Sequence, residues 1–184
     1  MRRDVVPGSV FPDYELPDHE GIPRRLSDLQ GNNAMVLLLG RGKHCRREHL
    51  HQREMVKFDE WCEVAFTSLV TVLPNEVQDV HDMRASTGAN WPFLADADLA
   101  LRRSLEIEEY TDTQHNATVP HTIVLAPGLV VDKVFIGYWF WGRPSPYQLW
   151  ADLQDLLRRI KPDFDPTLPG PRAEWDAAQQ APST

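Results

Sequence analysis

The stretch AMVLLLGRGKHCRRE, residues 34–48, decides the fold of this chain. Its first six residues are all apolar, which is typical of a strand that is buried on both faces of a parallel or mixed sheet. The segment from Cys45 to Trp61 holds no Pro or Gly, and its apolar residues recur near helical spacing, so it predicts a helix. Cys45 is therefore expected at the point where a central strand passes into a long helix.

The rest of the chain alternates strand and helix signals around this unit. An N-terminal hairpin is expected over residues 13–29, because a Gly-containing turn separates two short extended pieces. The remaining segments predict strands over 64–73, 122–125 and 130–138 and helices over 76–87, 98–105 and 145–160. In the last of these helices, Ser145 is the predicted N-cap and Pro146 follows it in the first turn. The order of elements indicates an α/β fold with a mixed central sheet flanked by helices.

The C-terminal segment differs in composition from the body. Residues 161–184 contain five prolines and few aliphatic side chains, so they bury too little surface to offset the entropy of ordering. The length of 184 residues fits one domain and a tail. We therefore predict a single domain over residues 1–160 and an extended or disordered tail over residues 161–184.

Charge and hydropathy exclude several classes of partner. The chain has 27 acidic and 19 basic residues, a net charge of −8, which argues against nucleic acid and anionic membranes as partners. Its apolar runs are far shorter than the roughly 20 residues that span a bilayer, and no signal peptide is evident. Two cysteines, Cys45 and Cys62, are too few for a disulfide framework. We expect a cytoplasmic protein with reduced thiols.

Cys45 lies in an unusually basic part of this acidic chain. Residues 41–53 hold five basic residues and one acidic residue, a local charge of +4. The start of a helix presents free N–H groups and the positive end of the helix dipole, and both favour an anion. Cationic surroundings and a helix N-terminus favour the thiolate, which is the reactive form of cysteine. The pattern indicates a nucleophilic Cys45.

Two other interpretations of this segment remain open. Cys45 is an inert packing residue in the first, since buried structural cysteines are common. In the second, the donors of His44, Cys45, His49 and His51 bind a metal ion, with Cys45 and His49 at helical spacing. The neighbouring Arg and Lys side chains would repel a cation, so we assign no metal ligand and expect no cofactor.

Several motifs together resemble the peroxiredoxin-like AhpC/TSA (redoxin) family of the thioredoxin superfamily. The resemblance covers about residues 7–160 and implies a thioredoxin-like fold. Its motifs are PGSVFPDYEL at 7–16, LSDL at 26–29, RGKHC at 41–45, PFLAD at 92–96, VPHT at 119–122 and GRP at 142–144. The segment VPHT resembles the family's cis-proline loop, which faces the active cysteine, and an X-Pro bond before a strand is a candidate for cis geometry.

The resemblance implies roles for individual residues. Cys45 would be the peroxidatic cysteine, which attacks a hydroperoxide and becomes a sulfenic acid. Arg143 would be the guanidinium that stabilises the thiolate and polarises the peroxide. The residues expected to shape or support this pocket are Gly42, His44, Arg46, Glu48, Val119, Pro120 and Trp141.

The chain departs from the family pattern at two places. The family signature Pro-x-x-x-Thr-x-x-Cys reads Leu38, Gly42 and Cys45 here, so the Thr hydroxyl is missing and Arg41 or Lys43 is the candidate to replace it. The second cysteine of a C-x-x-C motif is also missing. Cys62 lies about 25 Å along the same helix, whereas a disulfide needs Cα atoms within about 7 Å. We therefore expect Cys62 to be a core residue.

The function expected from these features is that of a one-cysteine, thiol-dependent peroxidase. Its substrate would be hydrogen peroxide or an organic hydroperoxide, and its reductant a thioredoxin-like protein or a low-molecular-weight thiol. The aromatic run at 138–141 is the candidate face for a homodimer. The alternatives are a thiol–disulfide oxidoreductase and a non-catalytic binding or sensor module of the same fold.

Overall fold

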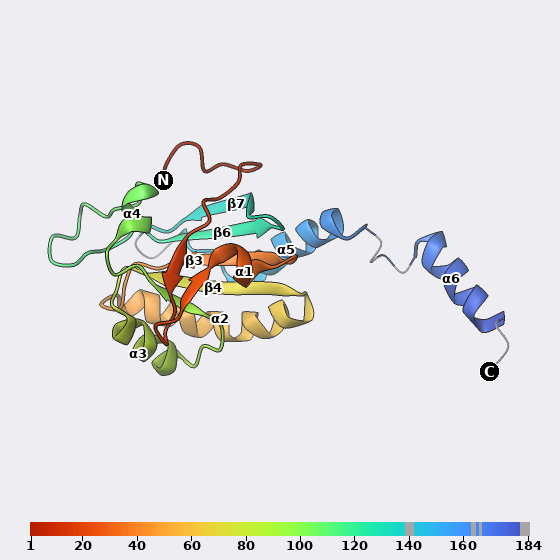
Figure 1. Ribbon diagram of the computed structural model, residues 1–184, viewed down its shortest axis with the longest axis horizontal. Helices are drawn as coiled ribbons and strands as arrows, with labels where there is room; N and C mark the ends of the chain where they lie inside the picture. Colours follow the sequence, from red (N-terminus) through yellow and green to blue (C-terminus); the bar gives the residue numbers. More distant parts are fainter. Residues whose placement is uncertain (139–141, 163–164, 166, 181–184) are drawn as a thin grey trace.

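A five-stranded mixed sheet forms the centre of the protein in the computed structural model, which describes residues 1–138, 142–162, 165 and 167–180 (Figure 1). The strand order is β5–β4–β3–β6–β7. Strand β3 pairs in parallel with β4 and antiparallel with β6. The five strands are β3 (Ala34–Leu39), β4 (Thr67–Leu73), β5 (Phe93–Ala95), β6 (His121–Ala126) and β7 (Val130–Ile136). The sheet therefore confirms the mixed α/β fold expected from the sequence.

The two faces of β3 explain its continuous apolar run. Val36 and Leu38 pack in a hydrophobic cluster with residues of the helices on one face of the sheet. Met35 and Leu37 alternate with them and pack in a second cluster on the other face. The first face carries α2 (Arg46–Val64), α3 (Val77–Thr87) and α5 (Pro146–Ile160), and the second carries α1 (Leu26–Gln30) and α4 (Ala100–Ser104). A strand covered on both faces has no polar side, so the alternation of polar and apolar residues is absent.

The N-terminal hairpin is also present. Strands β1 (Glu15–Pro17) and β2 (Pro23–Arg25) pair antiparallel. The carboxylate of Asp18, in the turn between them, accepts the backbone N–H groups of Glu20 and Ile22 and the Nε–H of Arg24. This buried aspartate satisfies the turn's free donors and fixes its shape.

Helix boundaries agree with the sequence where a local signal exists. Ser145 caps α5, because its hydroxyl accepts the backbone N–H of Gln148, as its position before Pro146 predicts. The strand predicted from residue 64 is wrong at its start. Helix α2 continues to Val64 and the chain turns at Phe66, whose φ of 48° is left-handed, so β4 begins only at Thr67.

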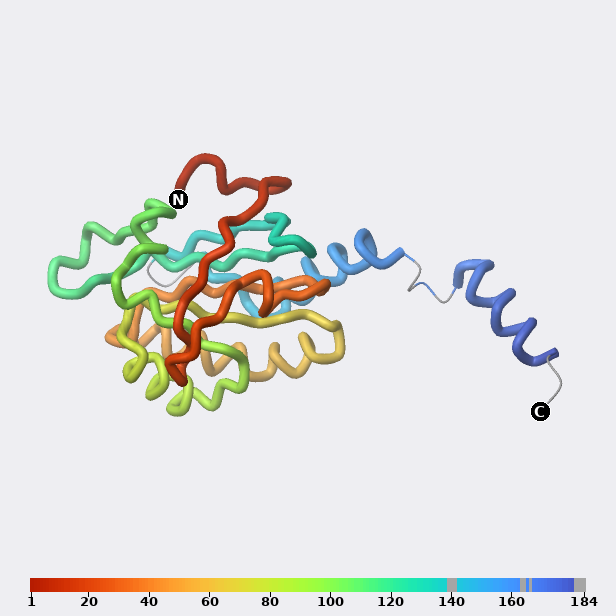
Figure 2. The backbone as a smooth tube through the Cα atoms, in the orientation of Figure 1, coloured from red at the N-terminus to blue at the C-terminus, as the bar shows by residue number. Residues whose placement is uncertain are grey.

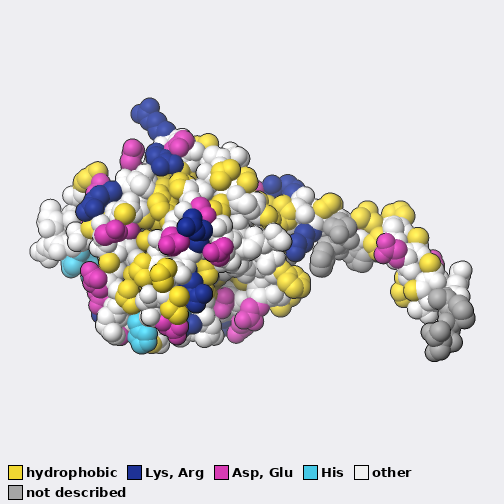
Figure 3. All heavy atoms as spheres, viewed as in Figure 1, with side chains coloured by type: hydrophobic (Ala, Val, Ile, Leu, Met, Phe, Trp, Pro, Cys, Tyr) yellow, Lys and Arg dark blue, Asp and Glu magenta, His cyan; other side chains and the backbone are white. Residues whose placement is uncertain are grey.

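The tail requires a second correction. Residues Pro169–Gln180 form α6, a helix within the segment expected to be extended or disordered. Its two prolines lie in the first turn, where a missing N–H costs nothing, and Arg172 pairs with Asp176 one turn later. Figure 2 shows α6 lying away from the body, and Figure 3 shows hydrophobic and acidic side chains on its surface. None of its residues is buried, so tertiary packing does not stabilise it.

No helix in the described parts of the chain has both the length and the apolar character needed to cross a membrane.

A pH dependence of stability follows from His121, which begins β6 and is 3 % exposed. Its Nδ1–H donates to the carbonyl of Val119 at 2.7 Å, and burial lowers the pKa of His121 to about 4. The unfolded chain takes up this proton near the ordinary value of about 6.5, while the folded chain resists it. The stabilisation from neutral His121 is therefore complete above that value and is lost as the pH falls through it towards 4.

We predict that the melting temperature of the wild type falls more steeply between pH 7 and pH 4.5 than that of His121→Asn, whose amide N–H can keep the bond to Val119. Thermal unfolding followed by circular dichroism at each pH measures both slopes. Equal slopes for the two proteins would contradict the prediction.

Candidate active site

Two glycines let the chain turn from β3 into α2. A Cβ at Gly40 would lie 2.4 Å from Leu73 Cδ2, which is inside any real contact. Gly42 has a φ of +128°, a conformation that side chains rarely adopt, and a Cβ there would also crowd the ring of His44 at 3.1 Å. Gly42 therefore shapes the loop that carries Cys45.

The turn places Cys45 at the N-cap of α2. Its backbone N–H donates to the carbonyl of Gly42 at 3.1 Å, and its own carbonyl accepts the N–H of Glu48 at 2.9 Å. The residue is half-buried, and it lines a cavity of about 590 Å³. The thiol thus lies at the positive end of the helix and remains accessible, which are the two conditions for a reactive cysteine.

Segments far apart in the sequence build the wall of this cavity. They are Arg41 and Arg47 on either side of Cys45, residues 108–111, Val119 and Pro120, Gly137 and Tyr138, and Arg143. Three arginines from two different parts of the fold therefore line the cavity together with Cys45. Of the residues expected in the pocket, Arg143, Val119 and Pro120 are brought to Cys45.

Arg143 is held in place by a buried ion pair. Its Nη2 donates to Oε2 of Glu48 at 2.6 Å, and the two side chains are 6 % and 1 % exposed. Glu48 stands on the first turn of α2, one turn after Cys45. The arginine expected beside the thiolate is thus positioned by the same helix that presents the thiol.

Glu48 is the centre of a larger buried network. Its Oε2 also accepts the backbone N–H of Arg41 at 2.9 Å, and its Oε1 accepts the amide of Gln52 at 2.9 Å. Thr71 Oγ1 donates to Gln52 Oε1, and Trp91 Nε1 donates to Thr71 Oγ1. These bonds run from the cavity wall into the hydrophobic core and give the buried carboxylate three hydrogen-bond donors.

The ionisation of Glu48 reflects these partners. Burial by itself raises the pKa of a carboxyl group, but the ring of His51, the charge of Arg143 and the N–H of Arg41 together outweigh it. They hold the pKa of Glu48 well below its ordinary value. The carboxylate is therefore ionised and pairs with a charged Arg143.

Arg41 is the second fixed cation of the cavity. Its Nε and Nη2 donate to the two oxygens of Glu109 at 2.6 and 2.9 Å, and Nη2 also donates to Asp112 at 2.9 Å. The bond to Glu109 raises the pKa of Arg41 further above its ordinary value, and Cys45 contributes to the same effect. Arg41 is thus charged, and it lines the cavity.

Among the described residues, Lys43 does not line the cavity. Its Nζ pairs with Asp79 at 2.6 Å and lies 3.7 Å from Asp82, and both aspartates belong to α3. Of the two candidates to replace the missing threonine, only Arg41 lines the cavity.

The loop at Pro120 corrects one expectation. The Val119–Pro120 peptide bond is trans, not cis. Trans is the lower-energy isomer of an X-Pro bond, and this loop accommodates it while Val119 and Pro120 still line the cavity. The N–H of Gly137 donates to the carbonyl of Pro120 at 2.7 Å and ties the loop to the end of β7.

Two other expected residues, His44 and Arg46, lie elsewhere. His44 contacts Asp112 and His115, and Arg46 lies on the exposed side of α2 beside His49 and Arg53. Neither lines the cavity among the residues described around it. Trp141 lies outside the described residues.

The four donors considered as a metal site do not converge. His49 Nε2 contacts the carbonyl of Lys43 at 2.8 Å, and His51 Nδ1 lies 4.0 Å from Glu48. His44 faces a different loop. Side chains at neighbouring positions of a helix start point in different directions, so closeness in sequence did not produce a cluster.

The sequence did not reveal the loop at 108–112. This segment has neither helical nor strand periodicity, yet it supplies Glu109 and Asp112 to Arg41 and residues 108–111 to the cavity. Arg47 was also missed as a wall residue. It carried the same signal as Arg46, and only the direction of each side chain from α2 separates them.

Cys62 is a core residue, as expected. It is fully buried in α2, and burial raises the pKa of its thiol to about 12. A protonated, inaccessible thiol near the far end of a 19-residue helix cannot reach Cys45.

Comparison with known sequences identifies the family. The sequence model of the AhpC/TSA family matches residues 7–134. The chain therefore belongs to the AhpC/TSA family, which confirms the resemblance and the class of enzyme expected from it, a thiol-dependent peroxidase and thus an oxidoreductase. Comparison with curated protein sequences finds no match to this chain.

Solved structures share the fold at low sequence identity. Peroxidoxin BcpB from Mycobacterium tuberculosis is 19 % identical with a TM-score of 0.68, over 84 % of this chain and 97 % of that one. PrxQ from Xylella fastidiosa is 16 % identical with a TM-score of 0.66, over 86 % and 96 %. Prx3 from Vibrio vulnificus, solved with hydrogen peroxide, is 15 % identical with a TM-score of 0.72, over 80 % and 98 %. These matches confirm the thioredoxin-like fold.

The buried ion pair makes a testable contribution to stability. We predict that Glu48→Gln lowers the free energy of unfolding by about 3–5 kcal/mol, because it leaves the charge of Arg143 buried without a partner. Asp176→Asn, which removes the exposed pair with Arg172 on α6, should cost less than about 1 kcal/mol. Urea denaturation of both variants measures the difference, and equal small losses would refute the role given to Glu48.

The same pair predicts a pH dependence. Since the pKa of Glu48 is lowered in the folded protein, its stabilisation is present above the ordinary value of about 4.3 and is lost as the pH falls below it. The difference in unfolding free energy between wild type and Glu48→Gln should therefore shrink between pH 5 and pH 3. Urea denaturation across this range measures it, and a constant difference would contradict the assignment.

Proposed function

We propose that this protein is a one-cysteine, thiol-dependent peroxidase in which Cys45 reduces hydrogen peroxide or an organic hydroperoxide. The observation that carries the proposal is the half-buried Cys45 at the start of α2, inside a cavity whose wall holds Arg41, Arg47 and Arg143. A thiolate needs cations and free N–H donors, and a peroxide needs hydrogen-bond donors on both oxygens. This cavity offers both.

The chemistry begins with the Cys45 thiolate. Its sulfur attacks one peroxide oxygen, an S–O bond forms and the O–O bond breaks. The second oxygen leaves as hydroxide or alkoxide and takes a proton to become water or alcohol. Cys45 is oxidised to the sulfenic acid, and the peroxide is reduced.

The two anchored arginines suit the transition state of this step. Negative charge moves from the sulfur to the leaving oxygen, so donors fixed before reaction are worth more than mobile ones. Glu48 holds Arg143 through one nitrogen, Nη2, and Glu109 holds Arg41 through two, so that neither side chain must be ordered during the reaction. Arg41 takes the place of the missing threonine as a donor to the peroxide.

Regeneration requires a thiol from outside the chain. Cys62 is fully buried, so it cannot attack a sulfenic acid in its own chain or in a second copy. An external thiol attacks the Cys45 sulfur, water leaves and a mixed disulfide forms. A second thiol then attacks this disulfide, releasing the oxidised reductant and the Cys45 thiol. A thioredoxin-like protein and a low-molecular-weight thiol both fit this sequence.

The setting of the enzyme completes the proposal. A reducing compartment such as the cytoplasm would keep Cys45 and Cys62 as thiols and supply the reductant. A homodimer is proposed through the aromatic run, of which Tyr138 is 54 % exposed beside the cavity.

The proposed function predicts a fast reaction of Cys45 with peroxide. Wild-type protein should react with hydrogen peroxide much faster than free cysteine, and Cys45→Ser should not react above background. Cys62→Ala is the matched control and should keep the wild-type rate within about twofold, because its sulfur is inaccessible. Stopped-flow Trp fluorescence gives the rates, and mass spectrometry should place one added oxygen on the peptide with Cys45. A wild-type rate no higher than that of free cysteine would overturn the proposed function.

The second prediction separates the arginines. Arg143→Lys should lower the peroxide rate by roughly 100-fold, since Lys keeps a charge near Glu48 but lacks the planar set of donors. Arg53→Lys, on the exposed side of α2, is the control and should leave the rate unchanged. Stopped-flow kinetics at matched thermal stability measures both variants. A wild-type rate in Arg143→Lys would remove Arg143 from the mechanism.

A further inference from the structure

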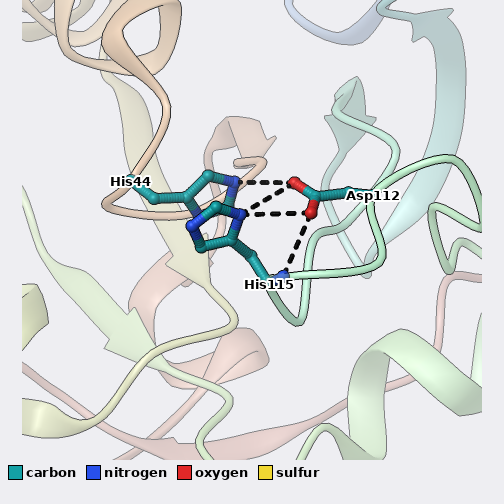
Figure 4. Close-up of side chains that lie close together, drawn as sticks. All are labelled: His44, Asp112 and His115. Carbon is teal, nitrogen blue, oxygen red and sulfur yellow. Dashed lines mark hydrogen bonds and ion pairs between the residues drawn. The ribbon is translucent and has the colours of Figure 1, made fainter.

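A second cluster of chemically active side chains lies directly beside Cys45 but outside its cavity. It consists of His44, Asp112 and His115 (Figure 4). His44 precedes Cys45 in the chain, and the other two belong to the loop between α4 and β6. The rings of His44 and His115 stack at 3.8 Å between centroids, and both present a nitrogen to the carboxylate of Asp112.

The spacing of the three donor atoms matches that of metal ligands. His44 Nε2 lies 3.4 Å from Asp112 Oδ2, and His115 Nδ1 lies 3.1 Å from the same oxygen. All three ligand atoms lie within 4.8 Å of one another. Zinc bonds of about 2.0–2.1 Å in a tetrahedron place neighbouring ligand atoms about 3.3 Å apart. Small side-chain adjustments would therefore bring the three atoms onto one ion.

The donor types select the class of ion. Two imidazole nitrogens and one carboxylate oxygen suit Zn²⁺, whereas Mg²⁺ and Ca²⁺ prefer oxygen ligands alone. Burial and the neighbouring His115 lower the pKa of His44, which favours the neutral ring that a metal ligand requires. The backbone N–H of Gln114 is the main group that lowers the pKa of Asp112 to about 2, so this ligand is ionised.

The nearby Arg41 does not cancel this preference. Its Nη2 donates to Asp112, and its Nη1 lies 3.4 Å from His44 Nε2. However, Glu109 accepts two bonds from the same guanidinium. The charges of Arg41, Glu109 and Asp112 sum to −1, so the group attracts a cation. Arg41 would give up its bond to Asp112 and keep Glu109.

Binding of one ion by both histidines requires a side chain to move. The two rings are parallel within 1°, so their in-plane lone pairs run side by side and do not meet. One ring must turn, and the His115 side chain is 44 % exposed, so it has room to do so. His115 Nδ1 now donates to the carboxylate, and binding would move that proton to the other ring nitrogen.

We propose that His44, Asp112 and His115 form a Zn²⁺ site, completed by water, that ties the loop after α4 to the residue before Cys45. Through Arg41, which donates to Asp112 and lines the cavity beside Glu109, the ion adjoins the wall of the active site without touching the thiol. The set differs from the donors grouped around Cys45 in the sequence, because Asp112 and His115 arrive from about 70 residues away.

The test is a zinc titration in a background without the reactive thiol. Cys45→Ser protein is titrated with ZnCl₂ by isothermal calorimetry, and MgCl₂ is the control salt. We expect one Zn²⁺ per chain and no heat from Mg²⁺. Adding His115→Gln should weaken zinc binding at least tenfold, since even the loss of a residue that supports a ligand costs about 10–100-fold.

His81→Gln is the matched control. His81 also lies beside an aspartate, Asp82, at 3.6 Å, but this exposed pair belongs to no group of three ligands among the described residues. The control variant should leave the zinc affinity unchanged. Equal zinc affinity in the His115→Gln and control proteins, or no binding in Cys45→Ser, would overturn the proposal. Neither result depends on peroxidase activity, because the thiol is absent from every protein compared.

Discussion

The buried ion pair between Glu48 and Arg143 is the interaction on which the rest of the site depends. Two unpaired charges at this depth would each cost several kcal/mol, so both must be satisfied for the fold to close here. The same carboxylate accepts the backbone N–H of Arg41 and the amide of Gln52. One side chain on the first turn of α2 therefore fixes the loop before Cys45, the helix after it and the arginine opposite it.

The desolvation of Glu48 and Arg143 costs free energy, and the site gains a fixed orientation of Arg143 from it. An apolar pair of the same size could stabilise the protein equally well, since buried ion pairs are weak evidence for stability. What an apolar pair could not do is hold a guanidinium at the cavity wall with its remaining N–H groups oriented. The bonds from Glu48 through Gln52 and Thr71 to Trp91 extend this rigidity into the core. The network thus links the stability of the fold to the orientation of Arg143.

Local patterns in the sequence were sufficient to predict most helices and strands. They could not predict which distant residues contact one another. The apolar run of β3, the cap at Ser145 and the helix after Cys45 each rest on a short pattern, and each was predicted. The end of α2, the helix in the tail and the trans bond before Pro120 were not, because competing local structures differ little in energy there. The site divides in the same way. Cys45 was predicted from its position between a strand and a helix. Glu109, in contrast, pairs with Arg41 from 68 residues away, and no pattern in the sequence predicts that pairing.

Ion pairs neutralise part of the local charge of +4 that the sequence shows around Cys45. Arg41 is neutralised by Glu109 and Asp112, Lys43 by Asp79 and Asp82, and Arg143 by Glu48. Within the part of the chain that the structure describes, Arg47 is the cavity-lining cation that forms no ion pair. The cavity is therefore rich in oriented N–H donors but modest in net positive field. Such a site stabilises charge that develops during reaction more than it attracts charge from solution. A neutral hydroperoxide, which becomes charged only as its O–O bond breaks, fits that environment better than an anionic substrate.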